Sequence, residues 1–321
     1  MLSNKIHYAL SMGIFITSLA SRSLYAAPET ETVDKGQSFA SPEEASKALV
    51  DAARDKDKNK VSLLFGSKYA QLFSSGDEVE DENNRADFLK MAEEKSFIES
   101  REANKAILHF GQNGWAFPIP VVNNGGQWRF DAEQGKQEIL NRRIGRNEMN
   151  TLGAVRAYVE AQTEYASIDR DGDEVSEFAT KIRSEPGKFD GLYWETAPGQ
   201  PESPLGPLFA EAKASGYQAK GSADNTPTPF HGYLYKILTR QGGHAPGGKY
   251  DYIINGNMMA GFALVAFPAV YGSSGIMTFV VNHQGKIYEK NLGPKTTELA
   301  SAMKAYDPDS SWEAVEETSV K

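Results

Sequence analysis

The stretch from Tyr250 to Leu292 constrains the fold of this chain more than any other part of the sequence. Three turn signals divide it into four short strands: Asn255-Gly256, Tyr271 to Gly275 (YGSSG) and Asn282 to Gly285 (NHQG). Between these turns, Met258 to Phe267 and Ile276 to Val281 are apolar on both alternating faces. A strand that is apolar on both faces has to be covered on both. These two segments are therefore predicted to be the central strands of an antiparallel sheet.

The N-terminus, residues 1–26, has the pattern of a secretory signal peptide. Lys5 and His7 precede an apolar segment from Ala9 to Ala20, which small residues follow, so cleavage is expected after Ala26. The apolar segment is too short to span a bilayer, which takes roughly 20 apolar residues, and no later stretch approaches that length. We expect an exported protein without a transmembrane segment, located in the periplasm or secreted.

The composition excludes some partners and one source of stability. The chain has 34 basic and 43 acidic residues and a net charge of −9. Cleavage of the signal peptide removes two basic residues, Lys5 and Arg22, and no acidic one, which gives a mature charge of −11. An acidic chain of this kind is a poor candidate for binding nucleic acid or an anionic membrane. There is no cysteine, so the protein depends on core packing instead of disulfides.

Residues 41–145 are predicted to form an N-terminal α+β domain, after a flexible segment at residues 27–40. Ser41-Pro42-Glu43-Glu44 starts a helix, and a further helix is expected from about Asn84 to Lys95. The hydrophobic period then changes to two, and Asn123 to Gly126 closes a hairpin. Helices followed by a curved antiparallel meander resemble the nuclear-transport-factor-2-like and cystatin-like folds in pattern. Those folds serve many functions, so the shape implies no chemistry.

Residues 146–306 are predicted to form a C-terminal α+β domain. A helix from Glu133 to Ile144 is expected to break at Gly145, which places the domain boundary there, and a long helix restarts at Asn147. Its broad apolar stripe is expected for a helix laid across a sheet. A long helix followed by an antiparallel sheet is similar to the globular heads of pilins, although the apolar stem of a pilin is missing.

The end of the chain is expected to close this domain. Pro294 to Tyr306 is predicted to be a helix with Leu299 facing inward, and residues 307–321 form a polar tail with Trp312 as its anchor.

The segment from Ser184 to Pro229 is rich in proline and glycine. A loop of this length is uncommon in a compact domain and is often functional. Aromatic residues in and around it predict a sugar- or peptide-binding surface, for which the candidates are Tyr193, Trp194, Tyr217, His231 and Tyr233, with Trp115 from the first half. The interpretation that we favour is that these side chains anchor the loop to the core.

A dense group of carboxylates follows the long helix: Asp169, Asp171, Asp173 and Glu177. Oxygen ligands at alternating positions around a glycine are what calcium prefers. However, Gly172 stands fourth from Asp169, whereas an EF-hand loop has its glycine sixth. Because the loop pattern is incomplete, the interpretation that we favour is an exposed turn that ends the helix. Calcium is the one cofactor for which the sequence offers ligands.

Two further patterns in the sequence, a phosphate-loop spacing and the distribution of histidines, do not predict a site. Gly243 to Lys249 (GHAPGGK) has the spacing of a phosphate loop, but Tyr250 and a strand follow it instead of Ser or Thr and a helix. No pair of histidines stands at the spacing of metal ligands. Catalysis would require His231 or His283 to meet a distant carboxylate in the fold.

Several segments resemble the bacterial domain-of-unknown-function family 2950. They cover nearly the whole mature chain: SPEEA (Ser41 to Ala45), WAFPIP (Trp115 to Pro120), RRIGRNE (Arg142 to Glu148), AVRAYVEAQTEYASIDRDGD (Ala154 to Asp173), DGLYW (Asp190 to Trp194), SPLGPL (Ser203 to Leu208), HGYLYKILTRQG (His231 to Gly242) and GFALVAFPAVYGSSGIMTFVVNHQGKIYEKNLG (Gly261 to Gly293). The resemblance implies an exported protein of Gram-negative bacteria. It carries over no catalytic residue.

The sequence favours a periplasmic module that binds or scaffolds without catalysis, with an envelope protein or glycan as its partner. The alternative is a hydrolase that acts on an envelope polymer through a cleft near residues 184–230. A histidine beside a carboxylate would favour the enzyme, whereas an aromatic groove without titratable pairs would favour the binding module. The oligomeric state stays open.

Overall fold

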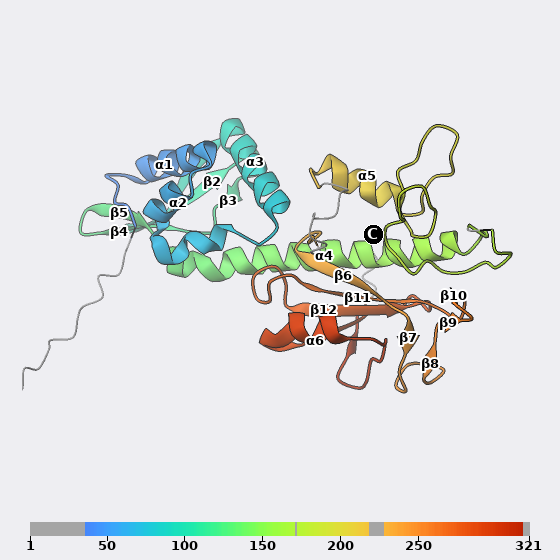
Figure 1. Cartoon of the computed structure of the whole chain (residues 1–321). Coiled ribbons are helices and arrows are strands. Elements are labelled where there is room, and N and C mark those ends of the chain that lie inside the picture. Colours follow the sequence, from blue (N-terminus) through green and yellow to red (C-terminus); the bar gives the residue numbers. More distant parts are fainter. Residues whose placement is uncertain (1–35, 171, 218–227, 317–321) are drawn as a thin grey trace, which may run out of the picture. The chain divides into compact units, whose positions relative to one another are not determined.

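The computed structural model describes residues 36–170, 172–217 and 228–316. The predicted signal peptide, residues 27–35 of the predicted flexible segment, and Asp171 lie outside the described residues. The described residues belong to one compact unit that combines helices with antiparallel sheets (Figure 1). The predicted α+β class is therefore confirmed. Two separate hydrophobic clusters, one in each half of the chain, form the core.

Helices open the described chain. α1 begins at the predicted capping box: the backbone N–H of Glu44 donates to Ser41 Oγ at 3.3 Å, and that of Ala40 donates to Glu44 Oε2 at 2.9 Å. The last of these helices starts several residues before the predicted Asn84, because Asp77 caps it. The helices are α1 (Pro42–Asp55), α2 (Lys58–Phe65), η1 (Ser67–Phe73) and α3 (Glu78–Glu94).

The N-terminal sheet has the order β1-β2-β4-β5, with β3 beside β2. Its predicted hairpin is confirmed, since Gly125 and Gly126 join β4 to β5 with positive φ angles. Phe39 is buried and exchanges two backbone hydrogen bonds of 2.9 Å with Trp128, so the predicted flexible segment ends before this residue. The strands are β1 (Ser96–Glu102), β2 (Lys105–Phe110), β3 (Trp115–Ala116), β4 (Val121–Asn124) and β5 (Gln127–Phe130).

One helix, α4 (Ala132–Tyr165), runs for 34 residues without interruption. The predicted break at Gly145 is therefore wrong. A glycine inside a helix costs only about 1 kcal/mol relative to alanine, and the buried neighbours Arg143, Ile144 and Asn147 hold the helix on both sides of it. The division of the chain at residues 145 and 146 stays a prediction. No described helix is both long and apolar enough to cross a membrane.

The C-terminal sheet has the order β14-β13-β12-β11-β6. β11 and β12 pair on both edges and are central, as predicted. Figure 1 shows α4 on one side of this sheet and α6 (Thr296–Ala302) on the other; Tyr158 of α4 donates its hydroxyl to the carbonyl of Ala263. The strands are β6 (Tyr233–Leu238), β11 (Ala263–Pro268), β12 (Met277–Asn282), β13 (Tyr288–Asn291) and β14 (Glu313–Ala314).

Short hairpins precede the central strands. β9 turns into β10 at Asn255-Gly256, where both φ angles are positive, as predicted. Met258 belongs to this hairpin, so the strand predicted from Met258 begins only at Ala263. The short elements are α5 (Gly206–Ala214), β7 (Arg240–Gln241), β8 (Tyr250–Asp251), β9 (Ile253–Ile254), β10 (Asn257–Met258) and η2 (Gly293–Lys295).

The closing helix α6 is shorter than predicted, and a different face of it is directed to the core. Leu299 is 45% exposed, and Thr296 and Ala300 are buried in its place. The polar tail adds the edge strand β14 to the sheet, so it contributes more than its predicted anchor, Trp312.

Candidate functional site

His231 lies where α3, α4 and the start of β6 meet. The carboxylate of Asp77 joins these elements by accepting hydrogen bonds from three segments of the chain. One of its oxygens accepts the N–H of Glu80 at 3.1 Å, and the other accepts the hydroxyl of Tyr217 at 2.8 Å and the N–H of Gly232 at 3.2 Å. These contacts join residues that are up to 155 positions apart in the chain. We call the group the polar junction: Asp77, Glu80, Arg146, Tyr217, His231 and Gly232.

The chain makes an unusual turn at the polar junction. His231 and Gly232 have φ angles of 51° and 73°, in the left-handed region that a histidine rarely adopts. Their N–H groups point at Tyr217 and Asp77, which hold the turn in place. A Cβ atom on Gly232 would lie 2.6 Å from Asn147 Nδ2, so only glycine fits there. The turn brings His231 to α3 and directs the chain into β6.

The charges of the junction are partnered. Glu80 Oε2 lies 3.5 Å from His231 Nδ1, and Glu80 Oε1 lies 3.2 Å from Arg146 Nε. The contact with His231 holds the pKa of Glu80 below its ordinary value; burial opposes this effect, and Arg146 adds to it. Burial and the hydrogen bond to Asp77 raise the pKa of Tyr217. Glu80 is therefore kept ionised and Tyr217 neutral, so that the phenol remains a donor.

The pair of His231 and Glu80 is the histidine–carboxylate pair that the hydrolase hypothesis requires. The carboxylate orients the imidazole through Nδ1, and the histidine side chain is 20% exposed. Asn150 Nδ2 lies 3.3 Å from the same nitrogen. In the described part of the chain, no hydroxyl nucleophile is in hydrogen-bond contact with the imidazole ring. The arrangement can exchange a proton with a bound molecule, but it supplies no nucleophile of its own.

The RRIGRNE segment of α4 makes further hydrogen bonds beside the polar junction. Arg143 Nη1 donates to the carbonyl of Ser74 and to Ser273 Oγ, both at 3.2 Å. Asn147 Nδ2 donates to the carbonyl of Ser274 at 2.9 Å. Sequence reasoning missed this role. The available signal was the spacing of the polar residues 143, 146, 147 and 150, which share one face of a helix.

Residues 36–315 match one family model, described as "Protein of unknown function (DUF2950)". The chain belongs to the DUF2950 family. The resemblance inferred from its segments is thus confirmed. No curated protein and no solved structure matches the DUF2950 chain, so the likenesses of its two halves to known folds stay predictions.

The structure separates the aromatic residues predicted as a binding surface. Tyr217 and His231 come together in the junction, with ring centroids 5.9 Å apart, and Tyr233 is fully buried in the core. Tyr193 stacks on Phe209 in the Pro-rich loop, at a centroid distance of 3.8 Å. No contact among the described residues joins Tyr193 or Trp194 to the junction.

The other two aromatic candidates hold the chain on itself. Trp194 is buried and donates its Nε1–H to the carbonyl of Pro201 at 3.0 Å. Trp115 packs against Phe117 in the N-terminal cluster. These contacts are those expected of side chains that anchor loops.

The carboxylates of the predicted calcium cluster accept N–H groups. Asp169 accepts those of Gly172 and Glu174 at 2.8 and 2.9 Å. Asp173 accepts the N–H of Val175 and the side-chain amide of Asn257, and the N–H of Met258 donates to Glu177. Among the described residues, which exclude Asp171, no group of three or more such ligands could hold a metal ion. The calcium site stays a prediction.

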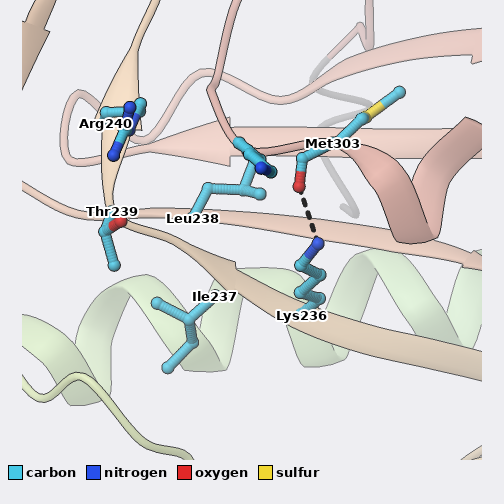
Figure 2. Close-up of a pocket in the computed structure, with 7 residues that line it drawn as sticks. Lys236, Ile237, Leu238, Thr239, Arg240 and Met303 are labelled. Carbon is cyan, nitrogen blue, oxygen red and sulfur yellow. Dashed lines mark hydrogen bonds between the residues drawn. The ribbon is translucent and has the colours of Figure 1, made fainter.

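A hollow of about 180 Å³ lies between β6 and the end of α6 (Figure 2). Lys236 reaches across it and donates to the carbonyl oxygens of Ser301 and Met303, at 2.6 and 2.7 Å. It thereby caps the C-terminus of α6, where cations are favoured. We call this site the basic hollow; its lining residues are Lys236, Ile237, Leu238, Thr239, Arg240, Met303 and Lys304.

The basic hollow has an excess of positive charge. Three of its lining residues are cations and none is a carboxylate. Arg240 pairs with Asp251 at 3.1 Å, an exposed contact outside the lining. Lys304 is exposed and forms no ion pair in the part of the chain that the structure describes. The site is suited to a ligand that carries carboxylates.

Proposed function

We propose that the DUF2950 chain is an exported, non-catalytic binding module that holds an acidic protein partner at the basic hollow. The observation that carries the proposal is the lining of this hollow, which has three cations and no carboxylate in a chain whose net charge is −9. Opposite charge favours the encounter and the orientation of a partner. Export is inferred from the signal-peptide pattern of residues 1–26.

The polar groups of the junction bond to one another within the protein, which supports a role without catalysis. Asp77 accepts three hydrogen bonds from protein groups, and both oxygens of Glu80 face protein cations or His231. Groups that are hydrogen-bonded to one another in this way rigidify and stabilise the fold. The junction thus has a sufficient structural role.

Hydrolysis of an envelope polymer is the second candidate function. One observation favours it: His231 has a strained backbone, with a φ angle of 51°, and is oriented by Glu80. Strained residues cluster at functional sites. Release of soluble fragments from dye-labelled peptidoglycan by the purified protein, and loss of that release in His231→Gln, would support this alternative.

Binding is tested by isothermal titration of the purified protein with hexaglutamate at low salt. The double variant Arg240→Gln/Lys304→Gln should weaken binding by roughly tenfold, a change of ~1.4 kcal/mol. Lys295→Gln is the matched control, because this exposed lysine lies at the opposite end of α6. Binding should weaken in added salt, which screens exposed charges. A wild-type protein that fails to bind the probe would contradict the proposal.

The export half of the proposal has its own measurement. N-terminal sequencing of the protein from the periplasmic fraction should give a chain that begins at Ala27. A chain that begins at Met1 in the membrane fraction would contradict it.

A further inference from the structure

The outer edge of β6 carries backbone groups to which no residue in the described part of the chain bonds. β6 is the last strand of its sheet and pairs only with β11 among the described residues. Ala269 N donates to the carbonyl of Gly232 directly opposite. Since hydrogen-bonded and non-hydrogen-bonded pairs alternate along an antiparallel ladder, Leu234, Lys236 and Leu238 face β11. Tyr235 and Ile237 direct their N–H and C=O groups away from the sheet.

Both ends of this edge are closed, and its middle is open. At one end Tyr233 exchanges backbone hydrogen bonds with Phe230, and at the other Tyr252 N donates to the carbonyl of Thr239 at 2.8 Å. Between them, no described residue bonds to the outward N–H and C=O groups of Tyr235 and Ile237. As far as the described residues go, these four adjacent groups are thus left to pair with an added strand.

The two faces beside this edge differ in chemistry. The side chain of Lys236 points to α6 and the basic hollow, which Arg240 and Lys304 also line. Ile237 points to the opposite side in Figure 2, toward α4, and Tyr235 contacts Thr151 of α4 on that side. Side chains of a strand alternate between its two faces. A strand added here would therefore place every second side chain among cations and the others beside an apolar surface.

We propose that the acidic partner binds as an extended strand against β6, with carboxylates at alternate positions that enter the basic hollow. This inference rests on the proposed function and specifies how the partner is held. Main-chain hydrogen bonds to Tyr235 and Ile237 supply affinity, and the alternation of acidic and apolar residues supplies specificity.

A second copy of the chain fits this edge less well than an acidic strand. Antiparallel pairing of two β6 strands would bring the cations of both copies to the same side of one short ladder, and like charges that face each other destabilise a sheet. A lysine on an edge strand often prevents such pairing by projecting into solvent. Here Lys236 is held against α6 instead, so its side chain does not project from the edge into solvent.

The test uses a blocked eight-residue peptide of alternating glutamate and valine. Hydrogen exchange of the isotope-labelled protein, followed by nuclear magnetic resonance, should show slower exchange for the amides of Tyr235 and Ile237 on addition of the peptide. The amide of Lys236, which already faces β11, serves as the internal control. The double variant Arg240→Gln/Lys304→Gln should lose this protection at the same peptide concentration.

Two methylated peptides complete the test. The N–H groups of an added strand alternate between facing β6 and facing away. Methylation of the valine nitrogens removes one set and methylation of the glutamate nitrogens the other, so one of the two peptides should bind roughly tenfold more weakly than the other.

The outcomes separate the two proposals. If the unmethylated peptide and hexaglutamate both fail to bind, the proposed function is wrong and the inference falls with it. If the peptide binds while the two methylated forms bind equally and the amides of Tyr235 and Ile237 exchange as before, strand addition is wrong and the binding function stands.

Discussion

The centre of the C-terminal sheet and the polar junction hold the chain together by opposite means. All six residues of β11 are buried, and β12 is paired on both sides. This centre consists of packed apolar side chains and ladder hydrogen bonds. The junction instead pairs Asp77 with Tyr217, and Glu80 with His231 and Arg146, and both acidic residues are buried.

The difference between the two regions lies in what each loses when it is altered. Burial of apolar area is non-directional, so the sheet centre tolerates change as long as volume and polarity are kept. A buried carboxylate is stable only when its hydrogen bonds are made. The sheet centre should therefore be the more sensitive region to a new charge, and the junction the more sensitive one to the loss of an existing charge.

The largest effect should come from Phe279→Asp in β12. Phe279 is 1% exposed and lies between Ala266 and Glu289 in the ladder. An unpaired buried charge costs several kcal/mol, which is comparable to the stability of a whole domain. The variant should not accumulate as a folded protein. Met149→Asp, at a side chain that is 73% exposed, is the control and should change stability by roughly 0.5 kcal/mol or less. Similar melting temperatures of the two variants would contradict the role of β12 as a central strand.

The second-largest loss of stability should come from Asp77→Ala, which removes the N-cap of α3 and two hydrogen bonds of the polar junction. Loss of the cap costs about 1 kcal/mol, and loss of the bonds to Tyr217 and Gly232 leaves buried donors unpaired, so we expect about 3 kcal/mol in total. Asp57→Ala is the matched control, because Asp57 caps α2 through a single bond to Asn59. Urea denaturation measures both. Equal losses would show that the junction contacts add nothing beyond the cap.

A smaller effect should appear in the dependence of stability on pH. The pKa of Glu80 is lowered in the folded state, chiefly by His231. A carboxyl group of this kind stabilises the fold above its unfolded pKa, about 4.3, and this stabilisation is lost as the pH falls through the lower folded value. Glu80→Gln should therefore lose less stability than the wild type between about pH 5 and pH 3.

The control for this pH effect is Glu78→Gln, at an exposed position two residues earlier in α3. It should keep the acid dependence of the wild type. Parallel pH profiles of the wild type and Glu80→Gln would mean that the contacts of Glu80 with His231 and Arg146 do not contribute to folding.

The sequence predicts the sheet centre but not the junction, for a physical reason. Both alternating faces of the strand up to Val281 are apolar, which is a local pattern, and the Asn255-Gly256 turn is set by two adjacent residues. The junction depends on residues 77, 146, 217 and 231, which meet only after the helices have packed. The predicted break at Gly145 failed because packing on both sides of the helix outweighs the local preference of one glycine.

The basic hollow was equally hidden from sequence reasoning. Lys236 lies in β6 and Arg240 in β7, and these two strands belong to different sheets. Lys304 joins them only because α6 ends beside β6, which no local pattern indicates. Residues that belong to one element are thus predictable as a set, whereas sites assembled from several elements are not.

The smallest effect is expected at the carboxylates that follow α4, which resemble neither region. Asp169, Asp173 and Glu177 accept N–H groups from their own loop or from the hairpin at Asn257 and Met258. A cation that binds them would have to replace these bonds, whereas a real site would stabilise the protein by about 2.7 kcal/mol at a hundredfold excess over its dissociation constant. Melting curves in millimolar calcium and in chelator should therefore coincide, for the wild type and for Asp171→Asn alike. A rise in melting temperature with calcium that Asp171→Asn abolishes would establish a metal site and contradict this assignment of the carboxylates to the fold.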